Sequence, residues 1–315
     1  MIDNFGRNID YLRISVTDLC NFRCVYCMPE EGVQKLRHEE ILSVEEIEEI
    51  AAAAAGLGVR KIRLTGGEPL VRKGIMDIVN RVARIPGIGE VTLTTNGSLL
   101  EANAKALKEA GLTRVNISVD AFDPDTYRDV TRGGEISDVL AGIEAAIDAG
   151  LTPIKLNAVL MGGVNDSFIR PLIAMTENAD FRVRFIEIMP IGECAGWNRE
   201  RFLSIEKVLE AEPTLAFFGT DGVSKLYRKP GSKGSVGLIS PISNHFCPTC
   251  NKVRVTADGK LKPCLHSAEE IGLRGLHGEE LAETIRAAIL AKPLQHELAR
   301  EKQSRSRRGM SAIGG

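Results

Sequence analysis

Short β-like runs alternate with amphipathic helical stretches from about residue 10 to residue 190, and this alternation constrains the fold more than any other feature. The predicted strands are Tyr11–Val16, Lys61–Thr65, Glu90–Thr95, Arg114–Val119, Ile154–Leu160 and Arg182–Ile188. The predicted helices are Val44–Leu57, Ile75–Arg84, Glu101–Ala110, Ile136–Ala149 and Phe168–Asn178. Such an alternation is typical of a parallel sheet with right-handed crossovers. Six units are too few for a complete eightfold barrel, so we predict an α/β fold built as an open, partial (βα)6 barrel.

Two serines stand at the starts of predicted helices. Ser43 precedes the first helix, and Ser137 lies at the beginning of the fourth. A serine hydroxyl at such a position can accept a hydrogen bond from a backbone N–H of the first turn. We therefore predict that both residues cap their helices.

Glycine-containing loops follow four of the predicted strands. They are Gly66–Pro69, Thr95–Gly97, Met161–Gly163 and Met189–Gly192. In α/β folds, ligands bind where the carboxyl ends of the parallel strands meet. We expect the functional site at this edge of the sheet.

The pattern changes after about residue 205. Short strand-like pieces occupy Ser224–Arg228, Val236–Ser240 and Asn251–Thr256, and a helix is predicted over Gly278–Ala291. We therefore expect two regions, residues 1–205 with the partial barrel and residues 206–315 with a different architecture.

The overall charge excludes some classes of partner. The chain has 40 basic and 42 acidic residues, a net charge of -2, so nothing global suggests binding to nucleic acid or to an anionic membrane. No apolar run reaches the roughly 20 residues of a membrane span. We expect a cytoplasmic protein, in which the 7 cysteines serve metal binding or catalysis instead of disulfides. Cys194 stands apart from the others, and we predict that it is a buried structural thiol.

The first cysteine group has the spacing C-x3-C-x2-C. Its members, Cys20, Cys24 and Cys27, lie in the loop after the first predicted strand. Thiolates bind iron–sulfur clusters, and three of them leave one iron of a four-iron cluster open to a reactant. A structural zinc site would need a fourth ligand. The spacing therefore favours a 4Fe-4S cluster over zinc or over cysteines that serve only packing.

This cysteine spacing and the loop Gly66-Gly67-Glu68-Pro69 together are the signature of the radical S-adenosylmethionine (SAM) superfamily, which the chain resembles. The resemblance implies that SAM binds the open iron through its amino and carboxylate groups. The glycine loop would meet the amino end of SAM. An electron from the reduced cluster would then break the sulfonium bond and release a 5′-deoxyadenosyl radical.

A second group of three cysteines lies in the C-terminal region. Cys247 and Cys250 form a C-x2-C pair, and thirteen residues separate Cys250 from Cys264. A zinc site that also used His245 or His266 is an open alternative. Beside a radical SAM motif, a second cluster is favoured, and its open iron could hold a nitrogen or oxygen of the substrate.

Longer stretches of the chain resemble the GTP 3′,8-cyclases, the radical SAM lyases that begin molybdenum-cofactor biosynthesis. The matching stretches are Thr17–Pro29, Ile62–Leu70, Thr94–Gly97, Asn116–Asp120, Lys155–Asn157, Gly163–Asp166, Arg184–Pro190, Cys247–Cys264 and Gly314–Gly315. Three positions depart from the usual family pattern. Lys252 and Leu19 stand where the family commonly has arginine, and His266 stands where it commonly has phenylalanine.

The resemblance implies a set of ligand contacts. Two 4Fe-4S clusters would be held by Cys20, Cys24, Cys27, Cys247, Cys250 and Cys264. SAM would contact Tyr26, Gly67, Ser118 and Met189. GTP would contact Arg13, Arg63, Thr94, Lys155, Lys252, Arg254, Gly314 and Gly315. Guanidinium groups suit a triphosphate because they bind its oxygens in pairs, and no side chain would itself act as the catalyst.

The implied reaction takes a hydrogen from ribose C3′ of GTP and joins that carbon to guanine C8. The product would be (8S)-3′,8-cyclo-7,8-dihydroguanosine 5′-triphosphate. The expected partners are an external low-potential electron donor, the next enzyme of the pathway and a second copy of the chain in a homodimer.

Two other functions compete with this one. A radical SAM peptide or protein maturase also uses an auxiliary cluster, but it would not need the terminal glycines or the basic residues Arg13, Arg63 and Lys155. A non-catalytic iron–sulfur or zinc module would need only the cysteines.

Overall fold

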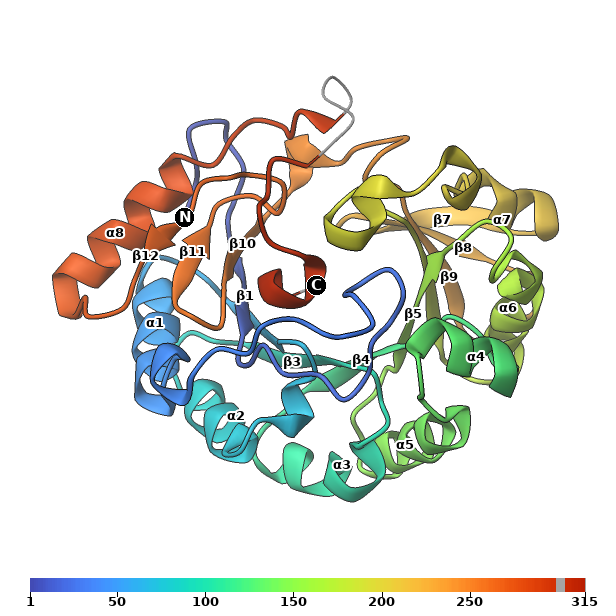
Figure 1. Ribbon diagram of the computed structural model, residues 1–315, viewed down its shortest axis with the longest axis horizontal. Helices are drawn as coiled ribbons and strands as arrows, with labels where there is room; N and C mark the ends of the chain where they lie inside the picture. The colour runs from blue at the N-terminus through green and yellow to red at the C-terminus, as the bar shows by residue number, and fades with distance from the viewer. Residues whose placement is uncertain (299–303, 315) are drawn as a thin grey trace.

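The computed structural model describes residues 1–298 and 304–314, whose strands form one twelve-stranded sheet. The strand order is β12-β11-β10-β1-β2-β3-β4-β5-β6-β9-β8-β7. The sheet curves around a central hollow, and the helices of the first half cover its outer face (Figure 1). The predicted partial barrel is confirmed, and the sheet stays open because β9 and β10 pair with further antiparallel strands instead of with each other.

The first half of the chain supplies six parallel strands and the helices between them. The strands are β1 Tyr11–Ser15, β2 Lys61–Thr65, β3 Glu90–Thr95, β4 Arg114–Ser118, β5 Lys155–Leu160 and β6 Arg182–Glu187. The helices are α1 Val44–Gly56, α2 Ile75–Ala83, α3 Leu100–Glu109, α4 Pro124–Thr131, α5 Ile136–Asp148 and α6 Ile169–Asn178. Every predicted strand and helix is present, and α4 is an addition that the sequence analysis missed.

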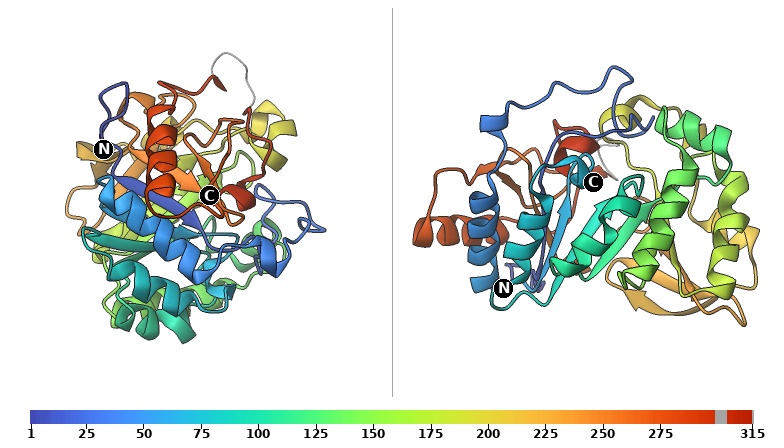
Figure 2. Two further views of the ribbon diagram at one scale, coloured as in Figure 1. Left: turned by 90° about the vertical axis from the view of Figure 1, so that its left-hand side faces the viewer. Right: turned by 90° about the horizontal axis from the view of Figure 1, so that it is seen from below.

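The C-terminal region extends both edges of the same sheet. Its elements are α7 Glu206–Ala211, β7 Ala216–Asp221, β8 Ser224–Arg228, β9 Ser235–Ile239, β10 Lys252–Val255, β11 Lys260–Lys262, β12 Ile271–Gly272, α8 Gly278–Leu290 and α10 Met310–Ile313. Strand β9 runs parallel to β6, and β10 runs parallel to β1. Helix α8 packs against α1 on the outside (Figure 2). The division at residue 205 stays a prediction, since both regions build one sheet.

Along each strand, the side chains point alternately into the hydrophobic core and into the central hollow. In β1, Leu12 and Ile14 are fully buried in the hydrophobic core, whereas Arg13 between them lines the central cavity. Likewise, Ile62 and Leu64 of β2 belong to the core while Arg63 faces the cavity. Successive side chains of a strand point to opposite faces, so the same strands that build the core also present a charged inner surface.

One of the two predicted helix caps is confirmed. The Ser43 hydroxyl accepts a hydrogen bond from the backbone N–H of Glu46 at 3.1 Å, and the Glu46 carboxylate accepts one from the Ser43 N–H at 2.7 Å. This reciprocal pair is a capping box. The prediction for Ser137 is wrong, because the capping position of α5 is Glu135, two residues earlier, and Ser137 is already the second residue of the helix. In the described part of the chain, no helix has the length and apolar character to cross a membrane.

Candidate active site

A cavity of about 560 Å³ lies in the hollow of the sheet. This volume is within the usual range for the pocket of a nucleotide-sized ligand. All six cysteines of the two groups line it, although they come from segments more than 200 residues apart. The structure therefore brings both predicted cluster sites to one cavity.

The first cysteine group forms a compact loop after β1. The Cys27 N–H donates to the Cys24 carbonyl at 2.9 Å, which closes a turn between the two residues. Burial raises the pKa of the Cys24 thiol well above its usual range, and the neighbouring Cys27 and Asp120 raise it further. Burial, then Cys20 and Cys194, raise the pKa of Cys27 to about 12. Grouped thiols of this kind need a cation to hold them as thiolates.

A single metal ion and a four-iron cluster make different demands on their protein ligands. Throughout residues 1–298 and 304–314, no three or more His, Cys, Asp or Glu side chains are grouped around a point that one metal ion could occupy. A zinc ion requires such convergence, whereas each iron of a four-iron cluster takes its own thiolate.

The glycine loop between β2 and η2 (Pro69–Val71) approaches the cysteine loop closely. A Cβ atom at Gly67 would lie 2.3 Å from the Leu19 carbonyl oxygen, so no larger residue fits. The backbone N–H of Gly67 donates to the Thr17 carbonyl at 2.9 Å. The loop is thus fixed against the segment that leads to Cys20.

The buried carboxylate of Glu68 ties this loop to β3. It accepts hydrogen bonds from the backbone N–H groups of Asn96 at 2.7 Å and Leu70 at 3.0 Å, and from the Thr95 hydroxyl at 2.8 Å. Burial raises the pKa of Glu68 to about 7, although these hydrogen bonds act in the opposite direction. The place of Glu68 in the Gly66–Pro69 motif was its only signal in the sequence, and none of these hydrogen bonds was predicted.

The four residues predicted to contact SAM, Tyr26, Gly67, Ser118 and Met189, all line the cavity. The Tyr26 hydroxyl donates to the Asp120 carboxylate at 2.9 Å. Asp120 also accepts from the Val159 N–H at 2.8 Å, and burial raises its pKa to about 6. These bonds hold the Tyr26 ring in place beside the cysteines.

Cys194 is buried, as predicted. Its side chain is 2% exposed, and its thiol donates to the Tyr26 carbonyl at 3.2 Å. Burial, then Glu193, raise its pKa to about 12.

Two buried cations support the backbone around the second cysteine group. Arg7 donates to the Cys247 carbonyl at 3.1 Å. Lys292 donates to the carbonyls of Lys252 at 2.9 Å and Pro263 at 2.8 Å, next to the remaining two cysteines. His266 lines the same cavity, and burial lowers its pKa to about 3.

Three arginines form a row across neighbouring strands. Arg13 of β1 is the register partner of both Arg254 of β10 and Arg63 of β2. All three line the cavity, and burial lowers the pKa of each. Repulsion from Arg254 lowers the pKa of Arg13 further. Neighbouring cations at one level of a sheet, one buried and two half-buried, favour a polyanionic ligand.

Thr94, Lys155 and Lys252 line the cavity together with this row, as predicted. Three further cations of the strands, Lys61, Arg114 and Arg184, line it as well, and the sequence analysis missed them. Each lies in a correctly predicted strand, so a charged residue in an otherwise buried run was the available signal.

The C-terminal segment enters the cavity. Figure 1 shows α10 in the centre of the curved sheet. The Gly314 carbonyl accepts hydrogen bonds from Arg13 at 3.2 Å and Arg254 at 2.8 Å. Gly314 has a φ of +74°, and a Cβ there would lie 2.3 Å from the Thr65 hydroxyl oxygen. Gly315, also predicted to contact GTP, lies outside the described residues.

Comparisons with known proteins agree with this geometry. Residues 14–175 match the profile of the Radical SAM superfamily, and residues 181–298 match that of Molybdenum Cofactor Synthesis C. Over 320 aligned residues, covering 100% of both chains, the chain is 52% identical to a GTP 3′,8-cyclase of Alkaliphilus oremlandii. It is 50% identical to a GTP 3′,8-cyclase of Alkaliphilus metalliredigens, again over 100% of both chains. The chain belongs to the GTP 3′,8-cyclase family. This membership sets aside the peptide maturase and the non-catalytic module.

Solved structures confirm the fold of this cyclase family member. Streptococcus suis SuiB bound to S-adenosylmethionine has a TM-score of 0.60 and 15% identity, covering 97% of this chain and 77% of SuiB. SuiB bound to the precursor peptide SuiA gives a TM-score of 0.62 and 14% identity, covering 94% of this chain and 68% of SuiB. At this identity the likeness is one of fold alone. As a radical SAM protein, the chain uses a 4Fe-4S cluster and SAM.

Proposed function

We infer that this protein is a GTP 3′,8-cyclase that forms (8S)-3′,8-cyclo-7,8-dihydroguanosine 5′-triphosphate, and that its two cysteine groups each hold a 4Fe-4S cluster. One observation carries the proposal: two sets of three cysteines and a row of three arginines line a single cavity. A cluster site, a second cluster site and an anion site are then within reach of one substrate.

The first cluster, on Cys20, Cys24 and Cys27, together with SAM supplies the 5′-deoxyadenosyl radical when both are bound. The chain's own part is to hold SAM in place. Gly67 would allow the backbone to approach the amino end of SAM, and Tyr26, whose hydroxyl is bonded to Asp120, would contact SAM as well. Ser118 and Met189 complete this proposed contact set.

The triphosphate of GTP is proposed to lie against the row Arg254, Arg13 and Arg63. Each guanidinium can bind phosphate oxygens in pairs, and the anion would relieve the mutual repulsion of these neighbouring cations. Lys155 adds a fourth positive charge from β5. Thr94 and Lys252 are proposed to contact the same ligand. Fixing the phosphates would hold ribose C3′ close to the radical source and exclude water.

The second cluster is proposed to bind Cys247, Cys250 and Cys264. Its fourth iron would be free to take a nitrogen or oxygen of the guanine base. Arg7 and Lys292, which hold the carbonyls around these cysteines, would keep the ligand loop in shape.

The reaction also needs partners. We propose an external low-potential electron donor, transfer of the labile product to the next enzyme of molybdenum-cofactor biosynthesis, and assembly as a homodimer. All seven cysteines, each within the described residues, are free thiols, which fits our proposal of a cytoplasmic location.

Iron analysis of anaerobically reconstituted protein tests the two-cluster proposal. The wild type should bind about eight irons with matching sulfide, and Cys264→Ala should bind about four, since each cluster contributes four. The Cys264→Ala variant should still cleave SAM under strong reductant, whereas Cys24→Ala should not.

Cys194→Ala is the matched control and should keep about eight irons, because that thiol is assigned no ligand role. Retention of the full iron content by Cys264→Ala, or zinc in place of iron and sulfide, would contradict the second cluster.

A further inference from the structure

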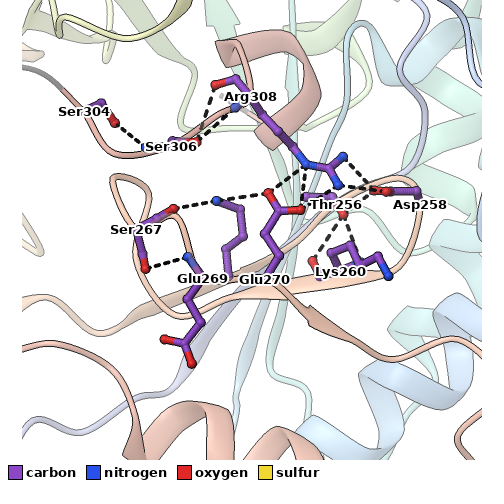
Figure 3. A network of polar contacts seen from close by, with 10 residues as sticks. Thr256, Asp258, Lys260, Ser267, Glu269, Glu270, Ser304, Ser306 and Arg308 are labelled. Carbon is purple, nitrogen blue, oxygen red and sulfur yellow. Dashed lines mark hydrogen bonds and ion pairs between the residues drawn. The ribbon is translucent and has the colours of Figure 1, made fainter.

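Arg308 lies at the centre of an ion-pair network that holds the C-terminal segment (Figure 3). Its guanidinium donates to both oxygens of Asp258, at 2.9 and 2.8 Å. It also donates to Glu270, with Nε 2.8 Å from Oε1 and Nη2 2.7 Å from Oε2. Two carboxylates thus bind one guanidinium, each in a paired geometry. We call Arg308, Asp258 and Glu270 the tail clamp.

The carboxylates of the tail clamp are themselves fixed to the edge of the sheet. Asp258 lies in the turn between β10 and β11, and it accepts from the Thr256 hydroxyl at 2.6 Å. Glu270 precedes β12 and lies 3.2 Å from the ammonium of Lys262, a fully buried residue of β11. Lys262 in turn donates to the Ser267 carbonyl at 2.7 Å. The clamp therefore joins the C-terminal segment to rigid strands.

The electrostatics of the clamp agree with its geometry. Although partial burial acts in the opposite direction, hydrogen bonds and ion pairs with the two carboxylates raise the pKa of Arg308. Arg308 likewise lowers the pKa values of Asp258 and Glu270. The three side chains are only about one fifth exposed, at 23%, 19% and 22%, so solvent screens them less than it screens surface pairs.

The residues after the clamp lead directly into the active site. A Cβ atom at Gly309 would lie 3.8 Å from the carbonyl oxygen of Cys27, and Met310 and Ser311 line the same cavity as the first cysteine group. Three residues later the Gly314 carbonyl accepts from Arg13 and Arg254. The six residues from 309 to 314 therefore contact both the proposed SAM cluster and the proposed phosphate site.

Residues 309–314 need contacts with the rest of the protein to hold their position. Helix α10 has 4 residues, far fewer than an isolated helix needs to be stable in water. Chain ends are poorly ordered unless they are tied down.

A guanidinium has five N–H donors, so Arg13 and Arg254 can bind the Gly314 carbonyl and still bind phosphate oxygens.

We propose that the tail clamp positions the C-terminal segment, so that Gly314 orients Arg13 and Arg254 toward the triphosphate. Arg308 is then a positioning residue, and it acts through the tail without touching the substrate. The effect on GTP rests on the proposed function, whereas the anchoring of the tail does not.

Hydrogen exchange of reconstituted protein tests the anchoring. In Arg308→Gln, the amides of residues 310–314 should exchange about tenfold faster than in the wild type, because the paired ionic bonds are lost. Amides of β10 and β11 should keep their protection, which shows that the fold is intact. Arg307→Gln is the matched control, since Arg307 is the exposed neighbouring arginine.

Steady-state kinetics test the consequence for the substrate. Arg308→Gln should raise the KM for GTP by about tenfold. Arg307→Gln should leave the KM unchanged. Arg308→Lys should raise the KM less than Arg308→Gln does, because lysine keeps the positive charge but cannot form paired hydrogen bonds with a carboxylate. The double variant Asp258→Asn with Arg308→Gln should have nearly the same KM for GTP as Arg308→Gln alone, because the two residues are partners in one network.

The two measurements can overturn the proposal separately. Unchanged exchange of residues 310–314 in Arg308→Gln would show that the clamp does not anchor the tail. A loosened tail with an unchanged KM for GTP would show that the tail does not orient the arginines. A wild type that forms no product from GTP would refute the proposed function instead, and the exchange result would still decide the anchoring.

Discussion

At the scale of single residues, Lys155 is a buried lysine whose pKa is shifted by its surroundings. It is 4% exposed and contacts the Asp221 carboxylate, which comes from the far end of β7. Burial, together with repulsion from Arg184 and Arg114, lowers its pKa to about 7 against the attraction of Asp221. The same contact, together with Arg184, lowers the pKa of Asp221 to about 2. The free protein therefore holds Lys155 close to its titration point.

A triphosphate near Lys155 should raise the pKa of its ammonium. At pH 8 the side chain is largely neutral in the free protein, so GTP binding should take up a proton. At pH 6 it is already protonated, and the uptake should vanish. Calorimetric titration of GTP in buffers of different ionisation enthalpy measures this proton uptake.

Lys155→Met is the control variant and should abolish the uptake at pH 8. Equal uptake in the variant and the wild type would show that another group titrates, and that Lys155 does not contact the triphosphate.

At the scale of single elements, two serines that look alike in sequence differ in structure. Ser43 caps α1 through a capping box, whereas Ser137 is an exposed residue of the first turn of α5. The position of the helix start decides the difference, and a shift of two residues is enough to remove a cap.

Ser43→Ala should therefore destabilise the protein by about 1 kcal/mol, since the Glu46 N–H loses its acceptor. Ser137→Ala should be neutral or slightly stabilising, because alanine favours the helix interior. Thermal unfolding of the two variants under identical conditions compares them. Equal midpoints for the two variants would contradict the capping assignment.

Much of the element pattern could be predicted from the sequence, because buried strands and amphipathic helices have distinct periods. The ends of the strands differ from the prediction by a residue or so. Strand β7 was missed because nearly all of its side chains are exposed, so it has no alternating pattern. The placement of β9 beside β6 and of β10 beside β1 was also missed, because sequence reasoning carries little information on long-range pairing.

The cysteines of the site could be predicted from spacing alone, and Arg63 from its charge in a buried run. Arg184 and Lys61 carried the same signal and were overlooked. Asp221 gave no signal, because it reaches Lys155 from a hairpin distant in sequence. The tail clamp depends on the fold for the same reason.

At the scale of the whole molecule, the two ends of the sequence build one site. The N-terminal half provides the first cysteine group and most of the inner strand surface. The C-terminal region adds a strand beside β1, the second cysteine group and a segment that ends in the central hollow (Figures 1 and 2). The open barrel therefore contains its own chain end, and the remaining cavity is lined by the two cysteine groups and by the cations of the strands.

Anaerobic turnover tests the central claim most directly. Reconstituted protein is mixed with SAM, a strong reductant and either GTP or ATP, and the products are followed by mass spectrometry. We predict 5′-deoxyadenosine together with an isomer of GTP that has the mass of GTP itself, formed with GTP and not with ATP. Formation of 5′-deoxyadenosine at the same rate with and without GTP, and no new nucleotide, would contradict the account.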